Sequence, residues 1–80
     1  MADELDLLQR WRDGNKAAGE ALARAHYREI FERLRRELRG DAELAAELTQ
    51  QVFEVAVSNR EDIVTDFRRY LHGTARFKLW

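Results

Sequence analysis

No proline interrupts this chain, and only four of its 80 residues are glycine. Proline breaks helices and glycine weakens them, so the scarcity of both favours long, uninterrupted helices. Alanine, leucine, glutamate and arginine, which all form helices well, supply much of the remainder. The sequence therefore predicts an all-α fold, a compact bundle of three to four helices. A chain of this length suffices for one domain with a small core.

Cysteine is absent as well. Its absence excludes disulfide bonds, thiol catalysis and thiolate metal sites, and it fits a reducing compartment. No apolar run approaches the roughly 20 residues that cross a membrane. The N-terminus is acidic and lacks the basic and apolar pattern of a signal peptide. We therefore expect a cytoplasmic protein with no membrane partner.

Apolar periodicity and capping residues predict four helices, at about residues 3–12, 16–39, 41–58 and 65–80. Gly40 suits a left-handed stop after the second helix. About two-thirds of the circumference of the third helix is apolar or small, which predicts that it is central and most buried. The expected core comprises Phe31, Leu34, Leu48, Val52, Phe67 and Leu71. The chain stops without a C-cap, which suggests that residues 1–80 are one domain of a longer protein.

The 14 basic and 15 acidic residues nearly balance, but they are unevenly distributed. Residues 1–40 carry nine basic and eight acidic side chains. Residues 41–66 carry seven acidic side chains and a single cation, Arg60, whereas residues 67–80 carry four cations and no acid. A chain that passes from mixed to acidic to basic charge in this way is typical of a protein with two different partners.

One narrow face of the expected third helix is acidic. It comprises Glu43, Glu47, Gln50 and Glu54, with Gln51 at its edge. No lysine or arginine within 41–58 pairs with these carboxylates along the helix. A solvated surface commonly mixes both signs, so a single sign favours a basic protein partner. The alternative is an acidic face that only contacts solvent.

The expected fourth helix carries the opposite pattern. Its members are the stripe Arg69, Gly73, Arg76 and Trp80, the flanking rings Tyr70 and Phe77, and the further cations Arg68 and Lys78. Cations interleaved with aromatic rings suit single-stranded nucleic acid, because arginine contacts phosphate and rings stack on bases. The alternative is a basic surface helix whose rings belong to the core or pack on a neighbouring part that this chain lacks.

Side chains for enzymatic chemistry are scarce. The chain holds two histidines, one serine and two lysines, and none of the catalytic-triad, zinc-binding, phosphate-loop or calcium-loop patterns. His26 is expected at the surface or boundary of its helix, and His72 on an exposed face between Arg69 and Arg76. We therefore predict no enzyme activity, no catalytic residues, no metal site and no cofactor.

Four segments resemble bacterial sigma factors, the extracytoplasmic-function group most closely. Residues 41–56, DAELAAELTQQVFEVA, resemble the signature D-x-E-D-A-E-D-L-T-Q-E-x-F-x-x-A. Residues 6–15 resemble the opening D-L-L-x-R-x-x-x-G-D, and residues 16–38 the long helix A-F-x-x-L-Y-x-x-Y. Residues 66–76 resemble the closing F-R-x-W-L-x-x-I-A-R-N. The four occur in family order and span nearly the whole chain.

The resemblance implies the region 2 domain of a sigma factor, which has two tasks in transcription initiation. One face docks on the clamp helices of the RNA polymerase core. Another recognises and melts the minus-ten promoter element and holds its single-stranded DNA. The family's docking core D-L-x-Q-E falls on Glu47, Leu48, Gln50 and Gln51. An anti-sigma factor stays open as a further partner.

Several positions depart from the family pattern. Leu44 and Ala46 replace acidic residues, Gln51 replaces Glu, Tyr70 replaces Trp, Phe77 replaces Asn, and Gly19 replaces an aromatic residue, which predicts a smaller core there. Two other interpretations therefore stay open. One is a protein-interaction module without initiation activity. The other is a helix-turn-helix DNA-binding regulator with its turn at residues 59–62.

Overall fold

The computed structural model describes residues 3–79, and this part of the chain is all-α, as predicted. Four α-helices follow one another: α1 (Glu4–Arg12), α2 (Lys16–Glu37), α3 (Ala42–Ser58) and α4 (Phe67–Lys78). One 3₁₀ turn, η1 (Arg60–Asp62), lies in the connection before α4. Residues 3–79 contain no strand, and the prediction of an all-α bundle is confirmed.

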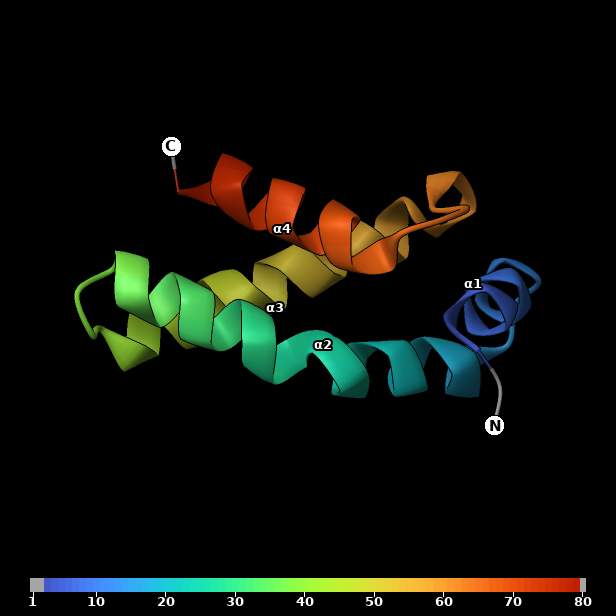
Figure 1. Cartoon of the computed structure of the whole chain (residues 1–80), viewed down its shortest axis with the longest axis horizontal. Coiled ribbons are helices and arrows are strands. Elements are labelled where there is room, and N and C mark those ends of the chain that lie inside the picture. Colours follow the sequence, from blue (N-terminus) through green and yellow to red (C-terminus); the bar gives the residue numbers. More distant parts are fainter. Residues whose placement is uncertain (1–2, 80) are drawn as a thin grey trace.

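Helices α2 and α3 form an antiparallel hairpin (Figure 1), and α4 packs against both of them. Helix α1 packs at a steep angle against the start of α2, close to η1. Contacts link α2 to all three other helices, whereas α3 packs mainly on α2 and α4. The expectation that the third helix is central is therefore corrected: the longest helix, α2, is the one on which the others assemble.

Each α-helix begins at a residue whose side chain accepts a hydrogen bond from the backbone N–H three residues later: Asp3, Asn15, Asp41 and Asp66. Such caps satisfy N–H groups that the first turn leaves unpaired. Helix α2 ends at Glu37, earlier than predicted. The reason is that Arg39, with a φ of 57°, already adopts a left-handed conformation, one residue before the predicted left-handed stop at Gly40.

The core is one continuous cluster to which every α-helix contributes. Leu34, Val52, Phe67 and Leu71 are fully buried, as predicted. Leu48 and Phe31 are only half-buried at the margin of the cluster, so their prediction as core residues was wrong. The fully buried residues of α3 are small or medium in size: Ala45, Thr49, Val52 and Ala56. Small side chains let α2 and α4 approach α3 closely.

Trp11 forms the main contact between α1 and α2. Its indole lies over the backbone of Gly19, where an added Cβ would come within 3.0 Å of three ring atoms. The indole also meets the ring of Phe67 edge-on, at 5.7 Å between centroids. The sequence predicts a smaller core at Gly19, but the indole of Trp11 fills the space that the missing side chain leaves.

Candidate protein and nucleic-acid interfaces

The acidic face predicted on the third helix lies on the outer surface of α3. Glu43, Glu47, Gln50 and Glu54 are exposed, and Gln51 is half-buried at the edge. None of the ion pairs formed between residues 3 and 79 involves these carboxylates. Leu44 lies beside them and is 38% exposed. The face therefore offers unpaired negative charge together with an apolar side chain, a combination that suits a basic protein surface.

The acidic face adjoins α4 at a shallow hollow. Gln51, Glu54 and Val55 of α3 line it together with Lys78 of α4. Lys78 is half-buried there, so it belongs to the border between the two helices rather than to the outermost stripe of α4. The two predicted faces are thus neighbours on the same side of the molecule, with their opposite charges next to one another.

The outer surface of α4 carries Arg69 and Arg76, which are both exposed and form no ion pair within the described chain. A shallow and mostly apolar groove runs beside them between α3 and α4. Its lining comprises Val55, Arg69, Tyr70, Gly73, Thr74 and Phe77.

Two features leave this groove open to a ligand. Phe77 is 79% exposed, and nothing lies within 4 Å of the place where a Cβ on Gly73 would stand. Tyr70 is half-buried and forms part of the wall. An apolar groove with guanidinium groups at its rim has the chemistry to accept a planar ring next to a phosphate.

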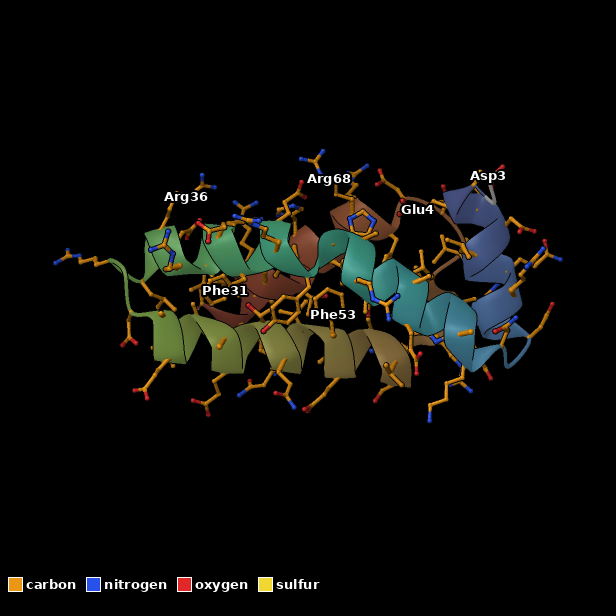
Figure 2. The ribbon with its side chains drawn as sticks, turned by 90° about the horizontal axis from the view of Figure 1, so that it is seen from below. Asp3, Glu4, Phe31, Arg36, Phe53 and Arg68 are labelled. Atoms are coloured by element: carbon orange, nitrogen blue, oxygen red, sulfur yellow. The ribbon has the colours of Figure 1, made fainter. Side chains whose placement is uncertain are left out.

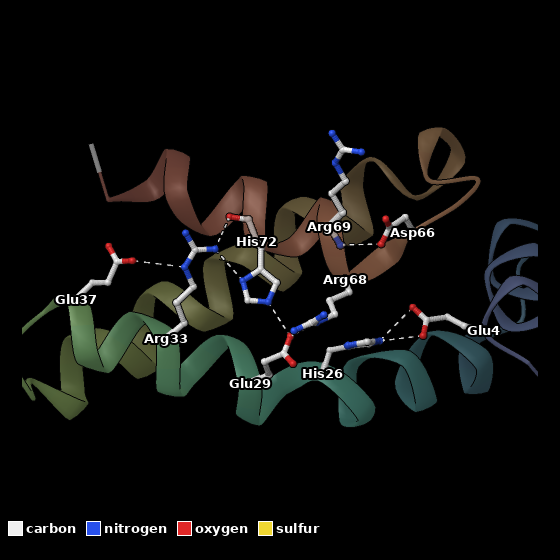
Figure 3. Close-up of polar contacts among 9 residues, drawn as sticks. All are labelled: Glu4, His26, Glu29, Arg33, Glu37, Asp66, Arg68, Arg69 and His72. Carbon is white, nitrogen blue, oxygen red and sulfur yellow. Dashed lines mark hydrogen bonds and ion pairs between the residues drawn. The ribbon is translucent and has the colours of Figure 1, made fainter.

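Arg68 points to the other side of α4, toward α2 (Figure 3). Its Nε donates a hydrogen bond of 2.7 Å to Oε2 of Glu29, and Nε2 of His72 lies 2.7 Å from the same oxygen. These two hydrogen bonds lower the pKa of Glu29 from 4.5 to about 2, and the carboxylate raises the pKa of Arg68. Among the predicted DNA-binding cations of α4, Arg68 is therefore the one that pairs with a carboxylate within residues 3–79.

His72 lies in the interface between α2 and α4, not on the exposed face that the sequence predicts. Arg33 donates a hydrogen bond of 2.8 Å to its Nδ1 and one of 3.2 Å to its carbonyl oxygen. Because a guanidinium only donates, Nδ1 accepts and Nε2 carries the proton that faces Glu29. The partners of His72 stand 39 and 43 residues earlier in the chain, so no local pattern identifies them.

His26 occupies the boundary position that the sequence predicts, and there it makes specific contacts. Its Nε2 lies 3.1 and 3.2 Å from the two carboxylate oxygens of Glu4 in α1. Its ring meets Phe67 of α4 edge-on at 5.5 Å. The side chain thus links three helices, which indicates a structural role at this position.

A third patch, formed by Arg24, Tyr27 and Arg28 on α2, has no counterpart among the predicted site residues. Together with Ala23, these residues line a shallow hollow. The apolar periodicity of the second helix places Tyr27 on its buried stripe, but its side chain is 41% exposed. The exposure of Tyr27 depends on how α2 and α3 pack, which the sequence does not give. The one local feature that could have pointed to this patch is a tyrosine with arginines three residues before it and one residue after it.

Trp80, the last member of the predicted nucleic-acid stripe, lies outside the described residues. Within residues 3–79, no three histidine, aspartate or glutamate side chains gather closely enough to hold a metal ion. Every helix in that range is too short or too polar to cross a bilayer. No family model, no curated protein and no solved structure matches this chain.

Proposed function

We propose that this chain is the region 2 domain of a bacterial RNA polymerase sigma factor of the extracytoplasmic-function group. The observation that carries the proposal is the pair of exposed faces of opposite charge on α3 and α4, two helices packed on one another. Along the chain these faces follow in the order that the family resemblance implies, with the acidic face first and the cationic and aromatic face second.

In this proposal, α3 docks on the clamp helices of the polymerase core. Glu43, Glu47 and Glu54 meet basic side chains there. Since the ion pairs formed between residues 3 and 79 involve none of these carboxylates, no such pair has to break first. Leu44 adds an apolar contact at a position where the family usually has an acid. Gln50 and Gln51 donate and accept hydrogen bonds at the edge of the same face.

The outer surface of α4 then takes the single-stranded minus-ten element of the promoter. Arg69 and Arg76 contact phosphates, while Phe77 and the neighbouring groove receive an unstacked base. Arg68 can contact a phosphate only if it first breaks its ion pair with the carboxylate of Glu29. The polymerase performs the chemistry, and this domain contributes binding and positioning.

The structural observations weigh differently on the two alternatives. A helix-turn-helix has a turn of three to four residues, whereas residues 59–66 separate α3 from α4 here. That longer connection, together with the acidic face beside α4, disfavours a reader of duplex DNA. The exposed Leu44 favours a protein-interaction module as the second candidate, because an apolar side chain in the acidic face suits protein contact without DNA.

Capture of purified core polymerase by the immobilised domain tests the proposal. Glu47→Lys reverses one charge in the centre of the acidic face and should weaken capture at least several-fold while the helical content stays unchanged. Glu20→Lys is the matched control, because Glu20 is exposed on α2 and the charge change is the same. Equal capture by the parent and both variants would remove the acidic face from the docking site. An absence of capture by the parent would favour the interaction module.

A further inference from the structure

The hollow on α2 combines an exposed ring with two exposed cations. Arg24 lies three residues before Tyr27 on the helix surface, and Arg28 directly follows it. The ion pairs formed between residues 3 and 79 involve neither guanidinium. Neither guanidinium therefore has to give up an ion pair to bind an anion that lies over the ring, although the nearby carboxylate of Glu32 offsets part of the charge of Arg28.

The ring of Tyr27 belongs to a set of nearly parallel aromatic side chains. It stacks on Phe31 at 6.4 Å with an interplanar angle of 8°, and on Phe53 of α3 at 5.8 Å with an angle of 21°. Phe31 and Phe53 lie in the space between the two helices, where they are half-buried (Figure 2). Because these neighbours hold the orientation of Tyr27, its ring is a firm platform rather than a freely rotating side chain.

This platform is separate from the groove beside α4. Phe53 faces α2 and touches Tyr27, whereas Val55 faces α4 and lines the groove with Phe77. The two patches therefore flank α3 on opposite sides, and the acidic outer surface of α3 lies between them. A ligand on one patch leaves the other accessible, so each can be tested while the second is neutralised.

We propose that Arg24, Tyr27 and Arg28 form a second binding site for single-stranded nucleic acid. One base stacks on the exposed part of the Tyr27 ring, and the two guanidinium groups contact the phosphates on either side of it. A nucleic-acid strand brings a planar base between two phosphates, which matches a ring between two cations more fully than an acidic peptide does. This site is independent of the polymerase and of the sigma-factor proposal.

The first test is a fluorescence titration of the whole chain with a labelled mixed-sequence DNA single strand. It uses the background Arg69→Ala/Arg76→Ala/Phe77→Ala, which removes the two phosphate contacts and the exposed ring proposed for the face of α4. Tyr27→Leu should weaken binding about 5- to 150-fold, which corresponds to the loss of one stacked base. Tyr27→Phe retains the ring and should bind like the background chain. Equal binding by the leucine and phenylalanine variants would overturn the stacking contact.

The cations are tested in the same background. Arg28→Ala should weaken binding and reduce the slope of log K against log salt by roughly 0.7, the value for one phosphate contact on a single strand. Arg36→Ala is the matched control, because Arg36 is an exposed arginine of α2 outside the hollow. If both variants lose affinity equally, general charge accounts for the binding and the site is refuted. Competition with polyglutamate and with unlabelled DNA is compared at equal concentrations of negative charge. If polyglutamate displaces the labelled strand at the lower concentration, the patch binds an acidic protein and the proposal is overturned.

A photo-crosslinking experiment on the unaltered chain does not depend on any variant folding. A single strand that carries 5-iodouracil reacts on illumination with an aromatic side chain stacked against the base. Digestion and mass spectrometry should place adducts on Tyr27 as well as on the peptide of α4. Adducts confined to α4 would contradict the proposal, whatever the titrations give.

Discussion

Two glycines inside helices give a matched pair for testing the packing of Trp11. An alanine in a helix interior is favoured over glycine by about 1 kcal/mol when nothing else changes. At Gly73 nothing else changes, because an added Cβ meets no atom within 4 Å. Gly73→Ala should therefore stabilise the domain by about 0.5–1 kcal/mol.

At Gly19 the same substitution should have the opposite sign. The new Cβ would lie closest to Nε1 of Trp11, 2.6 Å from Cδ1 and 2.9 Å from Cε2. The indole cannot easily withdraw, because Trp11 is only 8% exposed and its ring also packs on Phe67. Overpacking of this kind costs about 1–3 kcal/mol. After the gain in helix propensity, Gly19→Ala should destabilise the chain by up to about 2 kcal/mol.

The difference between the two variants isolates the packing term, since the propensity gain is common to both. Urea denaturation followed by far-ultraviolet circular dichroism should separate their unfolding free energies by about 1–3 kcal/mol, with Gly73→Ala the more stable. Their melting temperatures should differ by roughly 4–24 °C, at about 4–8 °C per kcal/mol for a domain of this size. Equal stabilisation by both substitutions would show that Trp11 does not cover Gly19 as described.

Three further predictions concern acid stability, the core and the face of α4. The pKa of Glu29 lies at about 2 in the folded chain against an ordinary 4.5, so its stabilisation is complete above pH 4.5 and is lost as the pH falls toward 2. Glu29→Gln should therefore flatten the stability profile in that interval, as measured by urea denaturation at a series of pH values. Leu71→Ala should cost about 2–5 kcal/mol in the same assay because Leu71 is fully buried, and half-buried Leu48→Ala should cost clearly less. Arg69→Ala/Arg76→Ala should weaken binding of a minus-ten single strand by the polymerase complex and lower the salt slope by about 1.4 for two phosphate contacts; an unchanged slope would remove α4 from the DNA interface.

Local sequence signals predicted the helices because the forces that start and stop them are local. Asp3, Asn15, Asp41 and Asp66 each cap the helix that follows directly, so a short window of sequence contains all the information. The exposed acidic and cationic faces were also predictable, since the spacing of charged residues along one helix fixes which of them share a side.

Contacts between distant segments were beyond such signals. His72 lies on a wheel position that solvent could reach, yet Glu29 and Arg33 of another helix enclose it. Leu48 lies on an apolar stripe, but the close approach of the helices at smaller residues leaves it at the margin of the core. A helical wheel gives the direction of a side chain, and the depth of burial depends on how closely the neighbouring helix approaches.

The carboxylate of Glu29 connects the stability of the fold to the presentation of α4. It receives hydrogen bonds from Arg68 and His72, one turn apart on α4, while Arg33 of α2 holds His72 from the other side. These contacts fix the rotation of α4 about its own axis, because two successive turns are tied to the same helix. With that side of α4 held against α2, Arg69 and Arg76 are kept on the outer surface. Glu29 also holds Arg68 away from any phosphate, so Glu29→Gln should release this guanidinium, strengthen binding of a single strand at neutral pH and raise the salt slope by roughly 0.7 for one added phosphate contact. Weaker binding with unchanged helical content would show instead that the fixed rotation of α4 matters more than the extra cation.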